Sequence, residues 1–147
     1  MATKSAPFSM RLSKRLEALV AQEAKRTGRS RGAVVEALAD EAMRMRLFPG
    51  IAFKGTDSER RAWVMGTGLD VWQVVDAYRD IGSVERMAED GSAGERQIRL
   101  GLAYYEQFPE EIDAAIAENR RPIEQLEEEY PFIQVLRIPS EQAPDAA

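Results

Sequence analysis

The spacing of hydrophobic residues changes from that of a strand to that of a helix within the first 46 residues. From Phe8 to Leu12 apolar and polar side chains alternate, which is the period of a β-strand. Ser13 and Ser30 are good helix N-caps, and Gly28 is a typical residue to end a helix. We therefore predict one strand and two helices, with apolar stripes at helical spacing: Leu16, Leu19, Val20 and Ala24, then Val34, Val35, Leu38 and Ala42.

The predicted strand has no partner within this segment. Unpaired backbone groups are costly inside a fold, so we expect the same strand of a second chain to pair with it. A two-stranded ribbon of this kind fits the major groove of DNA. Phe8, Met10 and Leu12 would face the helices, leaving Ser9 and Arg11 on the exposed face to contact bases. The alternative for Arg11 is a solvated strand residue.

The start of the second predicted helix is a candidate phosphate site. A helix N-terminus carries free N–H groups and partial positive charge, which attract anions. Arg29 and Arg31 flank Ser30 there, and Lys4 could add a phosphate contact from the N-terminal arm. The alternative is that Ser30 is only a helix cap.

A second pattern begins where Pro49 and Gly50 break the second helix. Alternating residues at 51–53 and 61–65 predict a β-hairpin. Gly66-Thr67-Gly68 is interpreted as a turn, because the Gly-Lys-Ser/Thr of a phosphate loop does not follow it.

Four further helices are predicted from the returning helical spacing. Capping boxes at Asp70/Gln73 and Ser92/Glu95 and the Pro109 segment mark three starts, and a short helix is expected at Val84–Glu89. The residues expected to face inward are Val71, Val74, Val75, Tyr78 and Ile81, then Ile98, Leu102 and Tyr105.

The order of a long, a short and a long helix is similar to a helix-turn-helix, in which Arg96, Gln97 and Arg99 would read DNA. The alternative is a structural three-helix cluster, because phosphates would repel so acidic a module.

The chain ends in an acidic run and then an apolar segment. Glu124–Glu129 should be solvated, and residues 130–138 are rich in β-branched and aromatic side chains, typical of a strand. That strand either completes its own domain or binds a partner's sheet edge or groove. In either case the large side chains expected to become buried are those of Tyr130, Phe132, Leu136 and Ile138.

Charge separates the same regions. Residues 1–46 carry ten Lys and Arg against five Asp and Glu, whereas the remainder carries ten against twenty. This asymmetry favours a basic module for nucleic acid joined to an acidic module for another partner. The alternative is segregation of surface charge by chance.

The residue inventory argues against an enzyme. The chain has no cysteine and no histidine, which removes thiolate chemistry, the commonest general base and the commonest metal ligand. Asp70 or Asp113 with a metal would be the remaining route, but both are interpreted as helix-terminal or surface residues. We expect no cofactor and no metal. No apolar run approaches the roughly 20 residues of a membrane span, so a cytoplasmic protein without membrane contact is expected.

The segments FSMRLSKRL and GRSRGAVVEAL closely resemble the ribbon-helix-helix family of repressors and antitoxins, over about a third of the chain. In that family two chains intertwine, the ribbon enters the major groove, and the start of the second helix clamps the DNA backbone. By position, the resemblance implies base contacts by Ser9 and Arg11 and phosphate contacts by Arg29, Ser30 and Arg31.

Residues 48–121 resemble a family of small domains found in antitoxins, usually beside PIN-type ribonuclease toxins. FPGIAF, GTGLDVWQVV and LAYYEQFPEEIDAAI carry this resemblance, although Gly68 stands where the family has an arginine. In antitoxins of the VapB kind a C-terminal segment occupies the toxin, which implies a role for Arg137. The acidic run at 124–129 could alternatively mimic RNA phosphates against a basic cleft.

These observations predict a mainly α fold. Residues 1–46 form a ribbon-helix-helix dimer, 47–122 a small helix-turn-helix-like domain with a short β-hairpin, and 123–147 a tail that binds a toxin. The predicted function is a dimeric antitoxin that binds operator DNA and neutralises a PIN-type ribonuclease toxin. The alternative is a stand-alone ribbon-helix-helix regulator with a sensing or oligomerisation domain.

Overall fold

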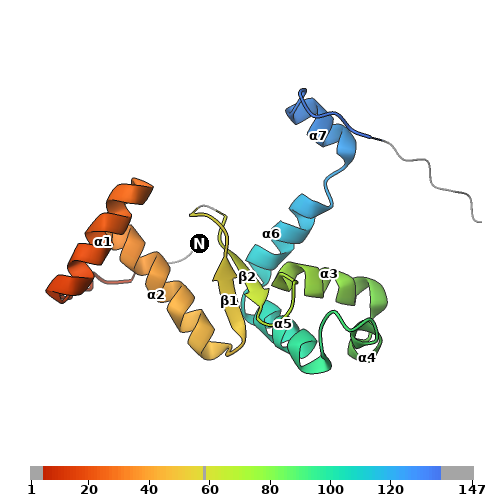
Figure 1. The fold of residues 1–147 in the computed structure, drawn as a ribbon, viewed down its shortest axis with the longest axis horizontal. Helices are drawn as coiled ribbons and strands as arrows, with labels where there is room; N and C mark the ends of the chain where they lie inside the picture. Colours follow the sequence, from red (N-terminus) through yellow and green to blue (C-terminus); the bar gives the residue numbers. More distant parts are fainter. Residues whose placement is uncertain (1–4, 58, 137–147) are drawn as a thin grey trace, which may run out of the picture.

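The computed structural model describes residues 5–57 and 59–136, which form a mainly helical structure with one small antiparallel hairpin (Figure 1). Two helices come first, then the hairpin, and then four helices that share a hydrophobic core with it, while a seventh helix stands apart. In order these are α1 (Lys14–Thr27), α2 (Arg31–Leu47), β1 (Ile51–Lys54), β2 (Arg61–Val64), α3 (Val71–Ile81), α4 (Val84–Ala88), α5 (Glu95–Gln107), α6 (Pro109–Asn119) and α7 (Ile123–Glu129).

The predicted caps of the first two helices are confirmed. The Ser13 hydroxyl accepts a hydrogen bond from the Leu16 N–H at 3.3 Å, and the Ser30 hydroxyl accepts one from the Ala33 N–H at 3.1 Å. Gly28 ends α1 with a φ of 67°, a left-handed conformation that other residues adopt only at a cost. We call α1 and α2 the helix pair.

The predicted hairpin is also confirmed. β1 and β2 pair antiparallel, with Ile51 opposite Val64 and Lys54 opposite Arg61. One face of the hairpin carries the buried residues Ile51, Ala62 and Val64. The alternating apolar residues in the sequence are therefore those that face the core.

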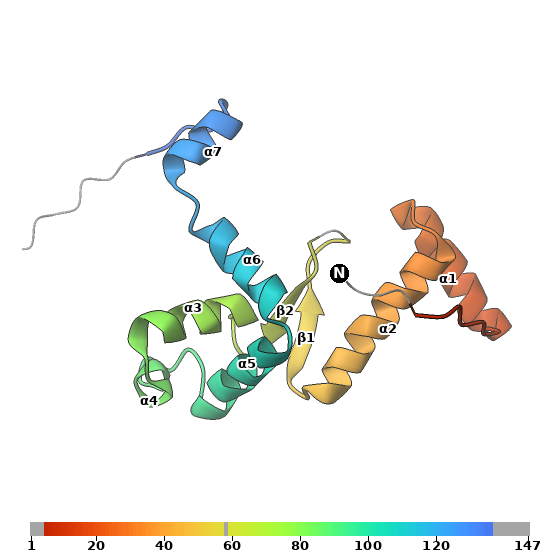
Figure 2. The same cartoon turned by 180° about the vertical axis from the view of Figure 1, so that it is seen from behind.

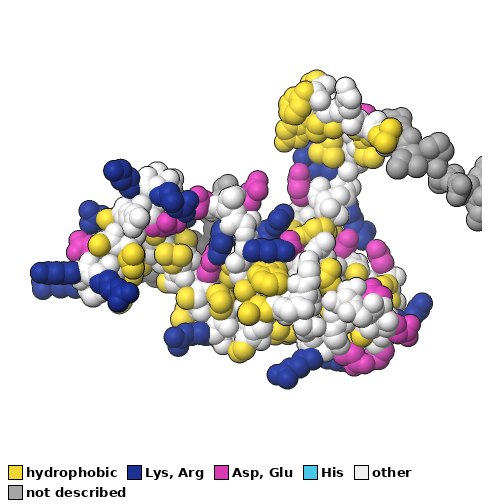
Figure 3. All heavy atoms as spheres, viewed as in Figure 1, with side chains coloured by type: hydrophobic (Ala, Val, Ile, Leu, Met, Phe, Trp, Pro, Cys, Tyr) yellow, Lys and Arg dark blue, Asp and Glu magenta, His cyan; other side chains and the backbone are white. Residues whose placement is uncertain are grey.

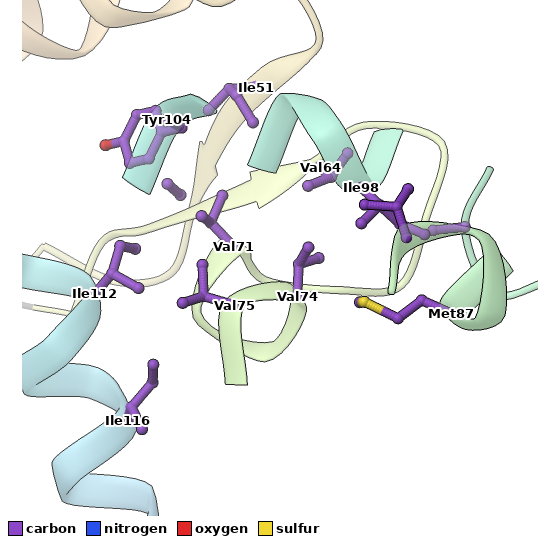
Figure 4. Close-up of a cluster of buried hydrophobic side chains, with 13 residues drawn as sticks. Ile51, Val64, Val71, Val74, Val75, Met87, Ile98, Tyr104, Ile112 and Ile116 are labelled. Atoms are coloured by element: carbon purple, nitrogen blue, oxygen red, sulfur yellow. The ribbon is translucent and has the colours of Figure 1, made fainter. Parts of the chain in front are cut away.

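A single hydrophobic core joins the hairpin to α3–α6, and we call residues 51–119 the central domain. Val71, Val74 and Val75 on α3 are nearly completely buried and lie between the hairpin, α5 and α6 (Figure 4). Gly101 lets α5 approach α3 closely, since a Cβ there would lie 3.1 Å from a Val74 methyl. The other buried members are Ile51, Ala62, Val64, Val84, Met87, Ala93, Ile98, Tyr104, Ile112 and Ile116.

The predicted start and inward face of α5 were partly wrong. The N-cap is Gly94, whose N–H donates to the Gln97 side chain at 2.9 Å, whereas Ser92 instead donates to the Asp90 carboxylate. The buried face is Ile98, Gly101 and Tyr104, because the close approach to α3 at Gly101 sets the rotation of the helix.

Four residues expected to face inward are less buried than predicted. Tyr78, on α3, is half-buried at the edge of the core. Leu102 and Tyr105 are only half-buried, on either side of the face centred on Tyr104. Ile81 is exposed because it is the last residue of α3, where the helix extends past the core.

The segment expected to form the ribbon has no regular secondary structure in the single chain. Phe8 is 85 % exposed and Met10 57 %, so the apolar set does not pack on the helix pair as predicted; only Leu12 is half-buried. A single chain offers this segment no neighbouring strand, and the predicted pairing requires a second copy.

The strand expected at 130–138 is not present over the part that the structure describes, residues 130–136. Phe132 and Leu136 are more than 80 % exposed, so this segment does not complete the central domain. The acidic run forms most of α7 instead. Lys4, Arg137 and Ile138 lie outside the described residues.

Within residues 5–57 and 59–136, no helix has both the length and the hydrophobicity needed to span a membrane.

The packing of the core predicts that the same change, isoleucine to alanine, lowers stability by different amounts at two positions. Ile98→Ala should destabilise the chain by about 2–5 kcal/mol, because Ile98 is only 1 % exposed and the lost side chain leaves a cavity. Ile81→Ala is the matched control, with an expected loss below about 1 kcal/mol at its 42 % exposed position. Urea unfolding monitored by circular dichroism measures both, and equal losses would contradict this description of the core.

Candidate nucleic-acid interface

The predicted phosphate-binding residues lie together at the turn between α1 and α2. Arg29, Ser30 and Arg31 are all exposed there, and Ser30 caps α2. Arg29 donates to the Ala33 carbonyl at 3.3 Å, and an Arg31 nitrogen lies 3.4 Å from a Glu17 oxygen. Both contacts are long and solvent-exposed, and such contacts cost little to exchange for a phosphate.

The predicted base-reading residues precede α1. Ser9 and Arg11 are exposed in a segment that extends from the helix pair. Their chemistry suits base edges, because Arg donates in a fork to guanine and Ser bonds to several partners. In the described part of the single chain, the Ser9 and Arg11 side chains make no hydrogen bond or ion pair that would orient them. Their role in base contact stays a prediction.

The helix pair has a largely uncovered apolar surface. Val20 and Val34 are its buried residues within the described ranges, whereas Leu16, Leu19 and Leu38 are each about half exposed. These leucines and Val20 line a groove of about 430 Å³ between α1 and α2. Hydrophobic side chains are visible between the basic ones at this end of the molecule (Figure 3). Contiguous exposed apolar surface of this kind marks an interaction site.

Arginine side chains connect the helix pair to the central domain. The Arg26 guanidinium contacts Asp57 at 2.8 Å, and that of Arg60 contacts Glu41 at 2.7 Å. Both ion pairs join one of the first two helices to the hairpin loop. Because these partners are 19 or more residues apart, helical or strand periodicity carried no signal for them.

A third connection is partly buried. Arg44, on α2, donates to the Tyr104 hydroxyl and to Glu111, each at 2.9 Å, and its guanidinium lies 4.1 Å from the centre of the Phe108 ring. Burial, together with the hydrogen bond to Glu111, raises the pKa of Tyr104 above its usual range. This cluster fixes the end of α2 against α5 and α6.

The acids considered for catalysis are held in ion pairs. The Asp70 carboxylate is buried and lies 2.7 Å from the Lys54 ammonium and 3.4 Å from Arg61. Asp113 lies 2.5 Å from Arg79, which lowers the pKa of its carboxyl. Within the described ranges, no three potential metal-ligating side chains come together. The contacts of Asp70 hold the hairpin against the start of α3, and the contact of Asp113 with Arg79 holds α6 against α3.

The residues proposed as a second DNA reader are differently engaged. Gln97 donates to the Met65 carbonyl at 3.2 Å, in addition to its capping contact. Arg99 lies 3.1 Å from Glu85, on α4, while Arg96 is exposed. Gln97 therefore links α5 to the end of the hairpin, whereas Arg99 makes an exposed ion pair with α4.

Three of the predicted partner-binding residues, Tyr130, Phe132 and Leu136, lie on an exposed apolar surface beyond α6, visible at the end of the molecule above the central domain (Figure 3). The rings of Tyr130 and Phe132 meet edge to face with centroids 5.9 Å apart. Arg121 holds α7 through Glu118 at 2.8 Å and through Glu129. We call this surface the tail patch: Ile123, Tyr130, Phe132, Ile133 and Leu136.

Comparisons of the chain with known protein families, with curated proteins and with solved structures found no match. The evidence for function consequently comes from the exposed surfaces, the distribution of charge and the sequence resemblances.

Proposed function

We propose that this chain is a dimeric antitoxin that binds operator DNA through its N-terminal segment and helix pair, and a PIN-type ribonuclease toxin through its tail. The observation that carries the proposal is the uncovered apolar surface of Phe8, Met10 and the helix-pair leucines beside the basic start of α2. Dimerisation covers the apolar surface, and DNA phosphates neutralise the positive charge at the start of α2.

The dimer explains the hydrophobic exposure. Each apolar leucine side chain stabilises an interface by about 1.5–3 kcal/mol when it is fully removed from water. A second copy supplies both a partner strand for residues 7–12 and matching helices for Leu16, Leu19 and Leu38. The self-complementary surface is that of a two-fold symmetric dimer.

Leu19→Glu should convert the dimer into a monomer, because it places a charge in an apolar interface. Leu19 is 55 % exposed in the single chain, so the substitution leaves the fold intact. Met65→Glu, at a similarly exposed position on the central domain, is the matched control. Light scattering after size exclusion should give twice the chain mass of 16.5 kDa for the wild type and the control, and the single mass for Leu19→Glu. A monomeric wild type would refute the proposal.

The DNA contacts divide by role. Residues at the start of α2 position the protein on phosphates, and Ser9 and Arg11 on the paired strands contact base edges. The acidic central domain then faces away from the duplex, apart from its hairpin. A two-fold symmetric protein reads a palindromic site.

Arg11→Ala should weaken binding to a specific duplex by about 1–3 kcal/mol, the usual value of a bidentate contact with guanine. The duplex is obtained by selection with the wild-type protein from a randomised pool, and affinity is measured by fluorescence anisotropy. Arg86→Ala removes the same charge from the exposed surface of α4 and should leave affinity within about 0.5 kcal/mol. Full affinity of Arg11→Ala would exclude base reading by this residue.

The tail patch supports the toxin-binding part of the proposal. Its side chains are exposed, it lies beyond the central domain, and acidic residues of α7 adjoin it. Exposed aromatic and aliphatic anchors beside acidic side chains suit a basic, apolar-lined groove such as the RNA-binding cleft of a nuclease.

A chain lacking residues 123–147 should bind DNA as the full chain does but lose the toxin, because none of the deleted residues that the structure describes, 123–136, belongs to the core. Co-expression with the product of the adjacent reading frame, followed by co-purification and a ribonuclease assay, tests this. Equal capture by the truncated chain would contradict a tail site. Failure of the full chain to capture any partner would favour the alternative below.

That alternative is a stand-alone regulator whose second domain senses a ligand. A groove of about 1040 Å³ between the helix pair and the hairpin favours it, and its lining includes Arg26, Arg44 and Arg60. These arginines already pair with carboxylates, so we prefer the antitoxin proposal.

A further inference from the structure

The tip of the hairpin lies on the same side of the molecule as the turn between α1 and α2, across a groove from it (Figures 1 and 2). α2 runs away from that turn, and the hairpin runs back along it, so the tip returns to the level of the turn (Figures 1 and 2). Gly55, Thr56 and Asp57 line the same groove as Arg26 and Arg29. We call residues 55–57 and 59–60 the hairpin tip.

Asp57 holds Arg26 in a two-pronged contact. One carboxylate oxygen accepts from Nη2 at 2.8 Å and the other from Nη1 at 3.2 Å. Two parallel N–H···O bonds from a guanidinium are also how arginine binds a phosphate. Arg26 is the main cause of the lowered pKa of Asp57, and Arg29 also acts on this carboxyl electrostatically. Glu23 completes the contacts of Arg26.

The hairpin tip is held in this position by its own contacts. Arg60 makes a two-pronged contact with Glu41, at 2.8 and 2.7 Å, and donates to the carbonyls of Phe53 and Gly55. Gly55 has a φ of 110°, and a Cβ there would lie 2.3 Å from the Glu59 carbonyl oxygen. The loop is therefore shaped so that Asp57 faces the helix pair.

We propose that Asp57 acts as an internal mimic of a DNA phosphate, which occupies Arg26 and so weakens backbone binding at the turn between α1 and α2. The inference rests on the proposed DNA-binding function. Arg26 precedes the turn that carries Arg29, Ser30 and Arg31, so the same duplex strand passes these groups. Asp57 and Arg26 are about half exposed, and an exposed ion pair is readily exchanged for a phosphate contact. The contact thus limits affinity without blocking binding.

Asp57→Asn tests this in the full chain, with the duplex selected by the wild-type protein. The substitution keeps the size of the side chain and removes the charge that faces Nη1 and Nη2 of Arg26, so that this edge can bind a phosphate while Glu23 still holds the Nε edge. We expect binding about threefold tighter per chain at moderate salt, and a salt dependence steeper by about 0.9 per chain, the value for one added phosphate contact. Anisotropy titrations from 50 to 200 mM salt measure both quantities.

Two further variants separate the specific contact from general repulsion. Glu59→Gln removes the same charge from the same hairpin tip and should produce a smaller gain and no change in salt dependence. In an Arg26→Ala background, Asp57→Asn should lose its effect, because the guanidinium that it frees is no longer there. Circular dichroism confirms that each variant is folded.

The outcomes distinguish this inference from the proposed function. If the wild type binds DNA and Asp57→Asn binds no better, or if Glu59→Gln gains as much, the mimic is refuted and DNA binding stands. A gain that persists without Arg26 also refutes it. If neither the wild type nor Asp57→Asn selects any duplex, both proposals fail together.

Discussion

The helix pair buries too little hydrophobic surface to be stable as an isolated unit. Among its described residues Val20 and Val34 are buried, while leucines and methionines on both helices remain exposed. In contrast, the central domain has a continuous core built around the valines of α3. The arginine contacts from Arg26, Arg44 and Arg60 attach the helix pair to that core, but they are mostly polar and do not cover its leucines. The need to cover this surface underlies the proposed dimer.

Polar contacts therefore have two different roles in this chain. Inside the central domain, buried groups such as Asp70 and Tyr104 are held by an ion pair or by hydrogen bonds to neighbouring elements, and they fix how secondary structure elements meet. At the turn between α1 and α2, the contacts are longer and exposed. Groups of the first kind are costly to disturb, whereas those of the second exchange easily with an incoming ligand.

Local sequence signals predicted the elements well. Ser13, Ser30 and Gly28 act through hydrogen bonds and backbone angles within a few residues, so their roles could be read without knowledge of the fold. Packing was harder to predict. The face of α5 depends on Gly101 meeting α3, and the expected strand after Tyr130 depended on pairing with another strand, which residues 130–136 do not have in the single chain. The contacts of Arg26 and Arg44 join residues 31 to 67 positions apart, and no periodic pattern contains that information.

The short connection between α2 and β1 has an evolutionary consequence. Only three residues separate the end of α2 from the start of the hairpin, and the hairpin runs back beside the helix towards the turn between α1 and α2 (Figure 1). Under the proposed function, changes in the charge of residues 55–57 and 59–60 adjust how strongly the protein holds DNA, while the residues proposed to read bases stay the same. The affinity of the proposed antitoxin for its DNA site and its choice of site would then diverge independently, through substitutions in two separate segments.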